Sequence, residues 1–138
     1  MAKVPPQAKK VYSGLLFSVY RWEQEQFDGS FKTFEMLRRI PSVSVIATVG
    51  DKIIAMDQEQ TGRPAYPSLP GGKLDPGEEP EAAAHRELLE ETGFTTKNLT
   101  LLKLYNEHSK IDYDDHVFLA HDCVKTEEQS LDSVEKIK

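Results

Sequence analysis

The sequence is poor in cysteine, in positive charge and in long apolar runs. Cys123 is its one cysteine, which excludes an internal disulfide framework and fits a reducing cytosol, so we expect a cytoplasmic protein. No stretch approaches the roughly 20 apolar residues of a membrane-spanning helix, so no membrane partner is expected. The four histidines lack the spacing of zinc ligands, which favours surface or internally bonded roles for them.

Positive charge is outnumbered, because 17 lysines and arginines stand against 23 aspartates and glutamates, for a formal net charge of −6. This balance argues against a broad surface for nucleic acid or anionic lipid, so no nucleic-acid partner is expected. A small anionic ligand would instead meet a local site. The 138 residues can bury one proper core. We therefore expect a tail over residues 1–10 and a single domain over residues 11–138.

Apolar and alternating runs rich in Val, Ile, Phe, Tyr and Thr predict several short strands. Gly50-Asp51 fits a two-residue hairpin turn, whereas the Gly- and Pro-rich segment 58–72 predicts a loop. Pro80 suits the first position of a helix over residues 80–92, and Gly93 suits its C-terminal cap. The expected strands cover residues 11–20, 31–38, 43–49, 52–57, 99–105 and 116–122.

The expected helix carries three glutamates at positions that are unfavourable for stability alone. Glu90 and Glu91 lie three and four residues after Glu87, so all three project from one face, where like charges repel. They also lie at the C-terminal end of the helix, where the macrodipole disfavours anions. A hard cation such as Mg²⁺ binds oxygen ligands, and this face can supply them. The cluster therefore predicts a divalent-metal site.

A solvated, glutamate-rich helix is the simpler interpretation, because Glu and Ala are good helix formers. That interpretation accounts for a lone pair of glutamates. It does not explain the Pro-Gly-Gly turn that precedes the helix, nor the spacing of Glu78 and Arg86 relative to the acidic cluster. We therefore favour the functional interpretation.

Residues 72–94 resemble a Nudix box. The stretch runs from Gly72 through Glu78 to Arg86-Glu87-Leu88-Leu89-Glu90-Glu91-Thr92-Gly93-Phe94. It fills every fixed position of the motif Gly, five residues, Glu, seven residues, Arg-Glu-apolar-x-Glu-Glu-x-Gly-apolar. The resemblance implies an enzyme that uses divalent metal to hydrolyse a diphosphate linked to a nucleoside or a similar group. It also implies an α/β fold, the α/β/α sandwich with a mixed β-sheet, in which the box forms a loop, helix and loop.

One departure from the family concerns the end of the domain. Nudix domains generally close with a second long helix on the other face of the sheet, and nothing after residue 123 has a helical apolar stripe. The segment Leu131–Lys138 instead resembles the loop and first strand residues that commonly precede that helix. We therefore expect the C-terminal helix to be missing or truncated, or the domain to close by other means, and we expect a homodimer.

The resemblance also implies roles for individual residues. Glu87 and Glu91 would ligate Mg²⁺ or Mn²⁺, with assistance from Glu90 and from the backbone carbonyl of Gly71. Arg86 would orient a neighbouring glutamate through its planar, permanently charged guanidinium. The general base stays open among three glutamates, which are Glu87, Glu90 and Glu135.

The segment before the box is more similar to the ADP-ribose pyrophosphatase branch than to the nucleoside triphosphate branch. It holds a strand-rich extension through Trp22 and a Gln-containing stretch that ends at Arg63. Both are candidate substrate-binding residues, and Trp22 would stack on an adenine. Two features depart from that branch: residues 68–72 read Ser-Leu-Pro-Gly-Gly instead of Glu-x-Pro-Ala-Gly, and no proline follows Pro80.

ADP-ribose or a related nucleoside diphosphate sugar is therefore the expected small-molecule substrate. Two alternatives stay open. The Leu-Pro-Gly-Gly sequence is common among Nudix enzymes that act on other nucleotides, which keeps nucleoside triphosphates and dinucleoside polyphosphates as candidates. The chain would otherwise be a Nudix-fold module that senses a nucleotide without cleaving it, but such sensors typically lose box glutamates and this chain keeps them all.

Overall fold

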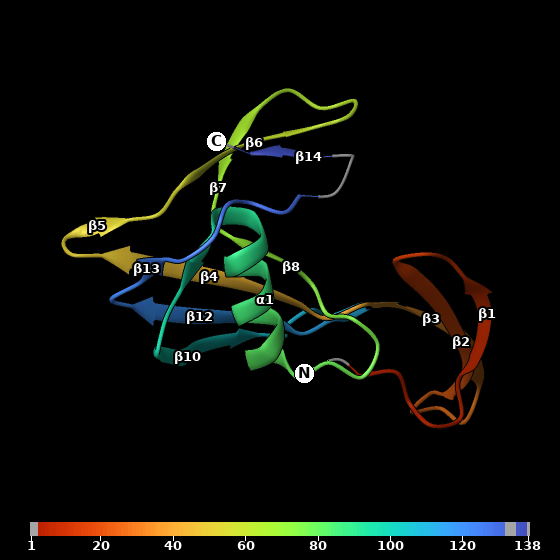
Figure 1. The fold of residues 1–138 in the computed structure, drawn as a ribbon. Helices are drawn as coiled ribbons and strands as arrows, with labels where there is room; N and C mark the ends of the chain where they lie inside the picture. Colours follow the sequence, from red (N-terminus) through yellow and green to blue (C-terminus); the bar gives the residue numbers. More distant parts are fainter. Residues whose placement is uncertain (1–2, 132–134, 138) are drawn as a thin grey trace. The chain divides into compact units, whose positions relative to one another are not determined.

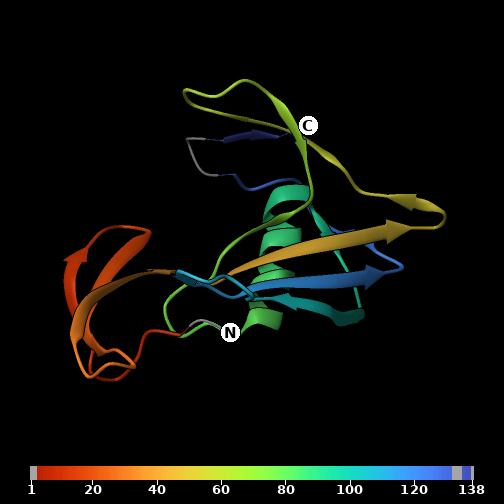
Figure 2. The same ribbon diagram turned by 180° about the vertical axis from the view of Figure 1, so that it is seen from behind.

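The computed structural model describes residues 3–131 and 135–137, with side chains through Leu131 (Figures 1 and 2). The chain divides into two compact units. The acidic helix expected from the sequence lies in the second unit. The first unit consists of Met1–Pro41 and Tyr105–Asp114, and the second of Ser42–Leu104 and Asp115–Lys138.

The first unit is a four-stranded sheet whose strands are, in order, β1 (Lys9–Ser13), β2 (Phe17–Glu25), β3 (Phe31–Arg39) and β11 (Ile111–Asp112). The first three strands are antiparallel, and β11 runs parallel to β3. The prediction of a single strand over residues 11–20 is wrong. The chain turns back after Gly14, whose N–H donates to the carbonyl of Phe17 at 2.8 Å.

Asp112 binds the N-terminal segment to this sheet. Its carboxylate lies 3.0 Å from Lys3 Nζ, and it accepts hydrogen bonds from Arg38 Nε at 3.1 Å and from the Val4 N–H at 3.2 Å. Burial by itself raises the pKa of Asp112, but these hydrogen bonds outweigh burial and hold the pKa below its usual value. Residues of the expected tail are therefore in contact with the sheet.

The central sheet of the second unit consists, in order, of β10 (Asn98–Tyr105), β12 (Asp115–His121), β4 (Ser42–Val49) and β5 (Lys52–Ile53), and β8 (Gly71–Lys73) also pairs with β4. The sheet is mixed, as predicted, because β12 runs parallel to β4 whereas β5 and β8 run antiparallel to it. The single helix of the described residues, α1 (Pro80–Thr92), packs on one face (Figure 1). The core between them contains Val43, Val45, Ala47, Ala83, Ala84, Leu88, Phe118, Ala120 and Cys123.

The bounds of α1 are those predicted for it. Pro80 occupies its first turn, and Gly93 ends it in the left-handed conformation with φ 74°. Ala83, Ala84 and Leu88 are completely buried against the sheet. Because two of these side chains are only methyl groups, the helix lies close to the strands. Its burial fixes the direction in which the remaining faces, including the acidic one, project.

The hairpin turn at Gly50-Asp51 is confirmed, since it joins β4 to β5 with Val49 opposite Lys52. Two predictions beyond it are wrong. Residues 52–57 are not one strand, because β5 ends at Ile53 and β6 (Met56–Gln60) begins separately. Residues 58–72 are not loop throughout, because β6 pairs with β7 (Tyr66–Ser68) and β8 follows. Backbone pairing here outweighs the turn-forming tendency of the Gly and Pro residues.

Two short pairings complete the second unit. β9 (Phe94–Thr95) pairs with β13 (Val124–Lys125), and β6 pairs with β14 (Glu135–Ile137). The strand expected within Leu131–Lys138 is therefore present. In the part of the chain that the structure describes, no helix is long and apolar enough to span a membrane.

Candidate metal-binding and catalytic site

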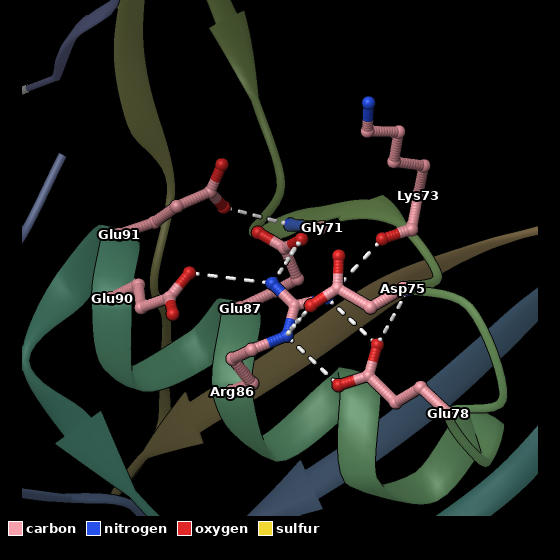
Figure 3. A network of polar contacts seen from close by, with 8 residues as sticks. All are labelled: Gly71, Lys73, Asp75, Glu78, Arg86, Glu87, Glu90 and Glu91. Carbon is pink, nitrogen blue, oxygen red and sulfur yellow. Dashed lines mark hydrogen bonds and ion pairs between the residues drawn. The ribbon is translucent and has the colours of Figure 1, made fainter. Parts of the chain in front are cut away.

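Arg86 lies at the centre of the candidate site and donates hydrogen bonds to three carboxylates (Figure 3). Its Nε and Nη2 donate to the two oxygens of Glu78 at 2.8 and 2.9 Å, which makes a bidentate pair. Its Nη1 donates to Glu87 at 2.8 Å and to Glu90 at 3.3 Å. Its Nη2 also donates to the backbone carbonyl of Lys73 at 3.2 Å. One permanent cation therefore gathers carboxylates that would otherwise repel one another.

Glu78 connects the loop before α1 to the helix. Its carboxylate accepts the N–H of Asp75 at 2.9 Å in addition to the two Arg86 contacts. The hydrogen bond from Arg86 is the main cause that lowers the pKa of Glu78 from 4.5 to about 2, against the opposing effect of burial. The same hydrogen bond is the main cause that raises the pKa of Arg86 above its usual range. Because the folded pKa of Glu78 is depressed, its ionised form stabilises the fold above pH 4.5 and loses this contribution as the pH falls toward 2.

Gly71 and Gly72 bring the backbone of β8 against the acidic cluster. The N–H of Gly71 donates to Glu91 Oε2 at 2.8 Å. A Cβ atom at Gly72 would lie 2.6 Å from the carboxyl carbon of Glu87, and one at Gly71 would collide with the backbone of β4. The close approach of β8 to the carboxylates therefore depends on both glycines.

The three glutamates on the acidic face of α1 differ in their access to water. Glu91 is buried, with 4% of its surface exposed, and the side chain of Glu87 is 12% exposed. The side chain of Glu90 is 43% exposed, and its 3.3 Å contact with Arg86 is longer than the 2.8 Å contact of Glu87. Glu90 is therefore the carboxylate of this cluster that water reaches most easily.

The donor set fits a hard divalent cation, because all of its side chains are carboxylates. In the arrangement of the described residues, no group of three His, Cys, Asp or Glu side chains is already poised to hold an ion. Glu87 and Glu90 contact Arg86, whereas Glu91 contacts the Gly71 N–H. A bound cation would share these carboxylates with their present hydrogen-bond partners. This is possible because each carboxylate has two oxygens, and each oxygen has two lone pairs.

The remaining predicted site residues lie on other elements. Trp22 lies on β2 in the first unit, where its ring packs edge-on against Phe34 with centroids 5.8 Å apart. Arg63 follows β6, and its guanidinium lies 5.5 Å from the centre of the Tyr66 ring. The backbone of Glu135 belongs to β14, and its side chain lies outside the described residues. The roles of these three residues toward a substrate stay predictions.

Sequence reasoning assigned no role in the site to three residues that contribute to it. Gly72 makes room for Glu87, Lys73 offers its backbone carbonyl to Arg86, and Asp75 Oδ2 lies 3.6 Å from Arg86 Nε. The glycine pair at positions 71 and 72 was a usable signal, because it marks a close approach of backbone. The carbonyl of Lys73 cannot be recognised from the sequence, because every residue has a backbone carbonyl.

The chain is similar to known proteins over most of its length. Residues 38–138 match the model of the NUDIX domain. The chain is 34% identical over 134 residues to the ADP-ribose pyrophosphatase of Bacillus subtilis (strain 168), which covers 94% of this chain and 72% of that protein. It is also 34% identical over 91 residues to the ADP compounds hydrolase NudE of Escherichia coli (strain K12), which covers 64% of this chain and 49% of that protein. The chain thus spans about half the length of NudE.

The fold also matches a solved structure. The crystal structure of an ADP compounds hydrolase superposes with a TM-score of 0.75 at 24% sequence identity. The superposition covers 96% of this chain and 75% of that chain. The α/β fold with a mixed sheet, expected from the sequence, is therefore confirmed.

The acidic cluster predicts that added Mg²⁺ or Mn²⁺ raises the melting temperature. A ligand at about a hundred times its Kd stabilises a protein by roughly 2.7 kcal/mol. The shift should vanish in the Glu87→Gln, Glu91→Gln double variant and persist in Glu81→Gln, which removes a charge from the first turn of the same helix. A thermal scan with and without metal measures this, and no shift with either ion would contradict the site.

Proposed function

This chain belongs to the Nudix family, and on that premise we propose that it is a pyrophosphohydrolase that cleaves a nucleoside diphosphate linked to another moiety. Water attacks the diphosphate, and the products are a nucleoside monophosphate and the phosphorylated second moiety. The acidic cluster gathered around Arg86 is the observation that carries this proposal. ADP-ribose or a related nucleoside diphosphate sugar is the preferred substrate, because a relative named ADP-ribose pyrophosphatase aligns with 94% of the chain.

Nudix hydrolases generally need a divalent metal, and Mg²⁺ or Mn²⁺ is the ion we propose for this chain. Glu87 and Glu91 would hold it, with Glu90 and the backbone carbonyl of Gly71 as further ligands. Such an ion neutralises the charge of the diphosphate and lowers the pKa of its bound water. The burial of Glu91 supports this assignment, because a carboxylate removed from water benefits most from a nearby cation.

Glu90 is the preferred general base. Its exposure to water and its 3.3 Å contact with Arg86 leave it more available than Glu87, which is less exposed and lies 2.8 Å from the same guanidinium. A base must come within hydrogen-bond reach of the proton that it accepts. Glu87 and Glu135 are the alternatives. Arg86 contributes by positioning. It holds the glutamates of α1 in place, and through Glu78 it fixes the preceding loop relative to the helix.

A module that senses a nucleotide without cleaving it is the non-enzymatic alternative. Such a module would not need a water-accessible general base, because it does not hydrolyse the nucleotide. This chain keeps every glutamate of the box, and the exposed carboxylate of Glu90 favours the enzyme.

The substrate assignment predicts that ADP-ribose is hydrolysed with a higher kcat/KM than a nucleoside triphosphate or a diadenosine polyphosphate at equal metal concentration. Trp22→Ala should raise KM for ADP-ribose severalfold, because aromatic contacts contribute about 0.5 to 1.5 kcal/mol beyond area burial. Trp22→Phe is the matched control, since it keeps an aromatic face. Initial-rate kinetics measure both effects. A tenfold preference for the triphosphate, about 1.4 kcal/mol of transition-state binding, would refute the substrate but not the family chemistry.

We further propose a cytoplasmic homodimer. The first unit exposes several large apolar side chains on its strands, and contact with a second copy of the chain would remove them from water. The exposed residues are Val11, Tyr12, Phe17 and Phe31. The free thiol of Cys123 is buried, and burial raises its pKa, which fits a thiol that stays reduced in the cytoplasm.

The dimer is tested by sedimentation at micromolar concentration, which should give twice the 15.6 kDa of one chain. A monomer mass would contradict the dimer.

A further inference from the structure

The C-terminal end of α1 is an unfavourable place for a fixed acidic cluster. The last carbonyls of a helix lack helical partners, and glutamates there face the negative end of the macrodipole. The last turn of α1 has no basic side chain that would compensate. The last carbonyls of α1 therefore need N–H donors from another part of the chain.

Residues 126–130, which we call the strap, supply such donors. The N–H groups of its first two residues donate to the carbonyl of Gly93 at 2.9 and 3.2 Å. The N–H of Ser130, its last residue, donates to the carbonyl of Glu90 at 2.8 Å. The strap passes the C-terminal end of α1 in Figure 1. It therefore binds the backbone of a residue whose side chain belongs to the acidic cluster.

The fit between strap and helix depends on Gly93. Its φ of 74° favours glycine, and a Cβ atom there would collide with the carbonyl oxygen of Glu127. The backbone of the strap thus lies directly against the helix cap. The chain on either side of the strap is also held: β13 pairs with β9 immediately after the cap, and β14 pairs with β6. A segment paired on both sides can hold the helix end in one position.

We infer that the strap is a positioning element for the metal-binding carboxylates, acting through the Ser130 N–H on the Glu90 carbonyl. The inference rests on the proposed function, because it assigns the strap a role in metal binding. Ser130 fixes the backbone at Glu90, which is followed directly by Glu91, so both carboxylates keep their direction. Coupling between two equilibria is reciprocal, so a strap that favours metal binding must itself be stabilised by bound metal.

Ser130→Pro tests the inference, because proline has no N–H to donate, and Ser130→Ala is the matched control because it keeps the N–H. Isothermal titration calorimetry should show that Ser130→Pro binds Mg²⁺ about fivefold more weakly, the factor expected for one neutral hydrogen bond, and that Ser130→Ala binds it like the wild type. In the wild-type protein, added Mg²⁺ should slow hydrogen exchange at the Ser130 amide.

The outcomes separate this inference from the proposed function. Equal Mg²⁺ affinity in Ser130→Pro and Ser130→Ala, or a Ser130 amide whose exchange does not respond to saturating Mg²⁺, overturns the role of the strap and leaves the hydrolase intact. Failure of the wild-type protein to bind either Mg²⁺ or Mn²⁺ overturns both. The exchange measurement uses no variant, so it decides the question even if Ser130→Pro does not fold.

Discussion

The bidentate contact between Arg86 and Glu78 is the interaction on which the candidate site depends. Charge-assisted pairs of this geometry are among the stronger hydrogen bonds in proteins. It joins the loop before α1 to the helix, and the same guanidinium donates hydrogen bonds to Glu87 and Glu90, which offsets part of their mutual repulsion. Without that charge, carboxylates on one helical face would repel one another and favour outward rotamers. Arg86 therefore keeps Glu87 and Glu90 close to one another in the absence of metal.

Close packing of backbone places those ligands. Ala83 and Ala84 let α1 lie against the sheet, and the glycine pair of β8 lets that strand pass beside the carboxylates. Glu91 is consequently buried and accepts a hydrogen bond from the Gly71 N–H, while the side chain of Glu90 stays accessible to water. This division suits a hydrolase, because a buried carboxylate can hold an ion while an exposed one meets the attacking water. The strap completes the arrangement from the helix end.

Local signals in the sequence were sufficient for the helix and for much of the candidate site. Pro80, Gly93 and the spacing of the glutamates act within a few residues, so α1 and its acidic face could be predicted. The turn after Gly14 was hidden inside an apolar run. β7 forms by pairing with the neighbouring β6 across a Gly- and Pro-containing turn, and β8 pairs with the distant β4. The contributions of Lys73 and Ser130 come from backbone groups, which every non-proline residue carries, so no side chain marks them.

The central claim, that Arg86 gathers the carboxylates before any metal binds, is tested most directly by the ionisation of Glu78. A carbon-13 NMR titration of its side-chain carboxyl in metal-free protein should give a midpoint near 2, far below the ordinary 4.5. In Arg86→Gln, which removes the cation, the midpoint should return toward 4.5. A wild-type midpoint near 4.5 would contradict the account, because Arg86 would then not hold Glu78 in solution.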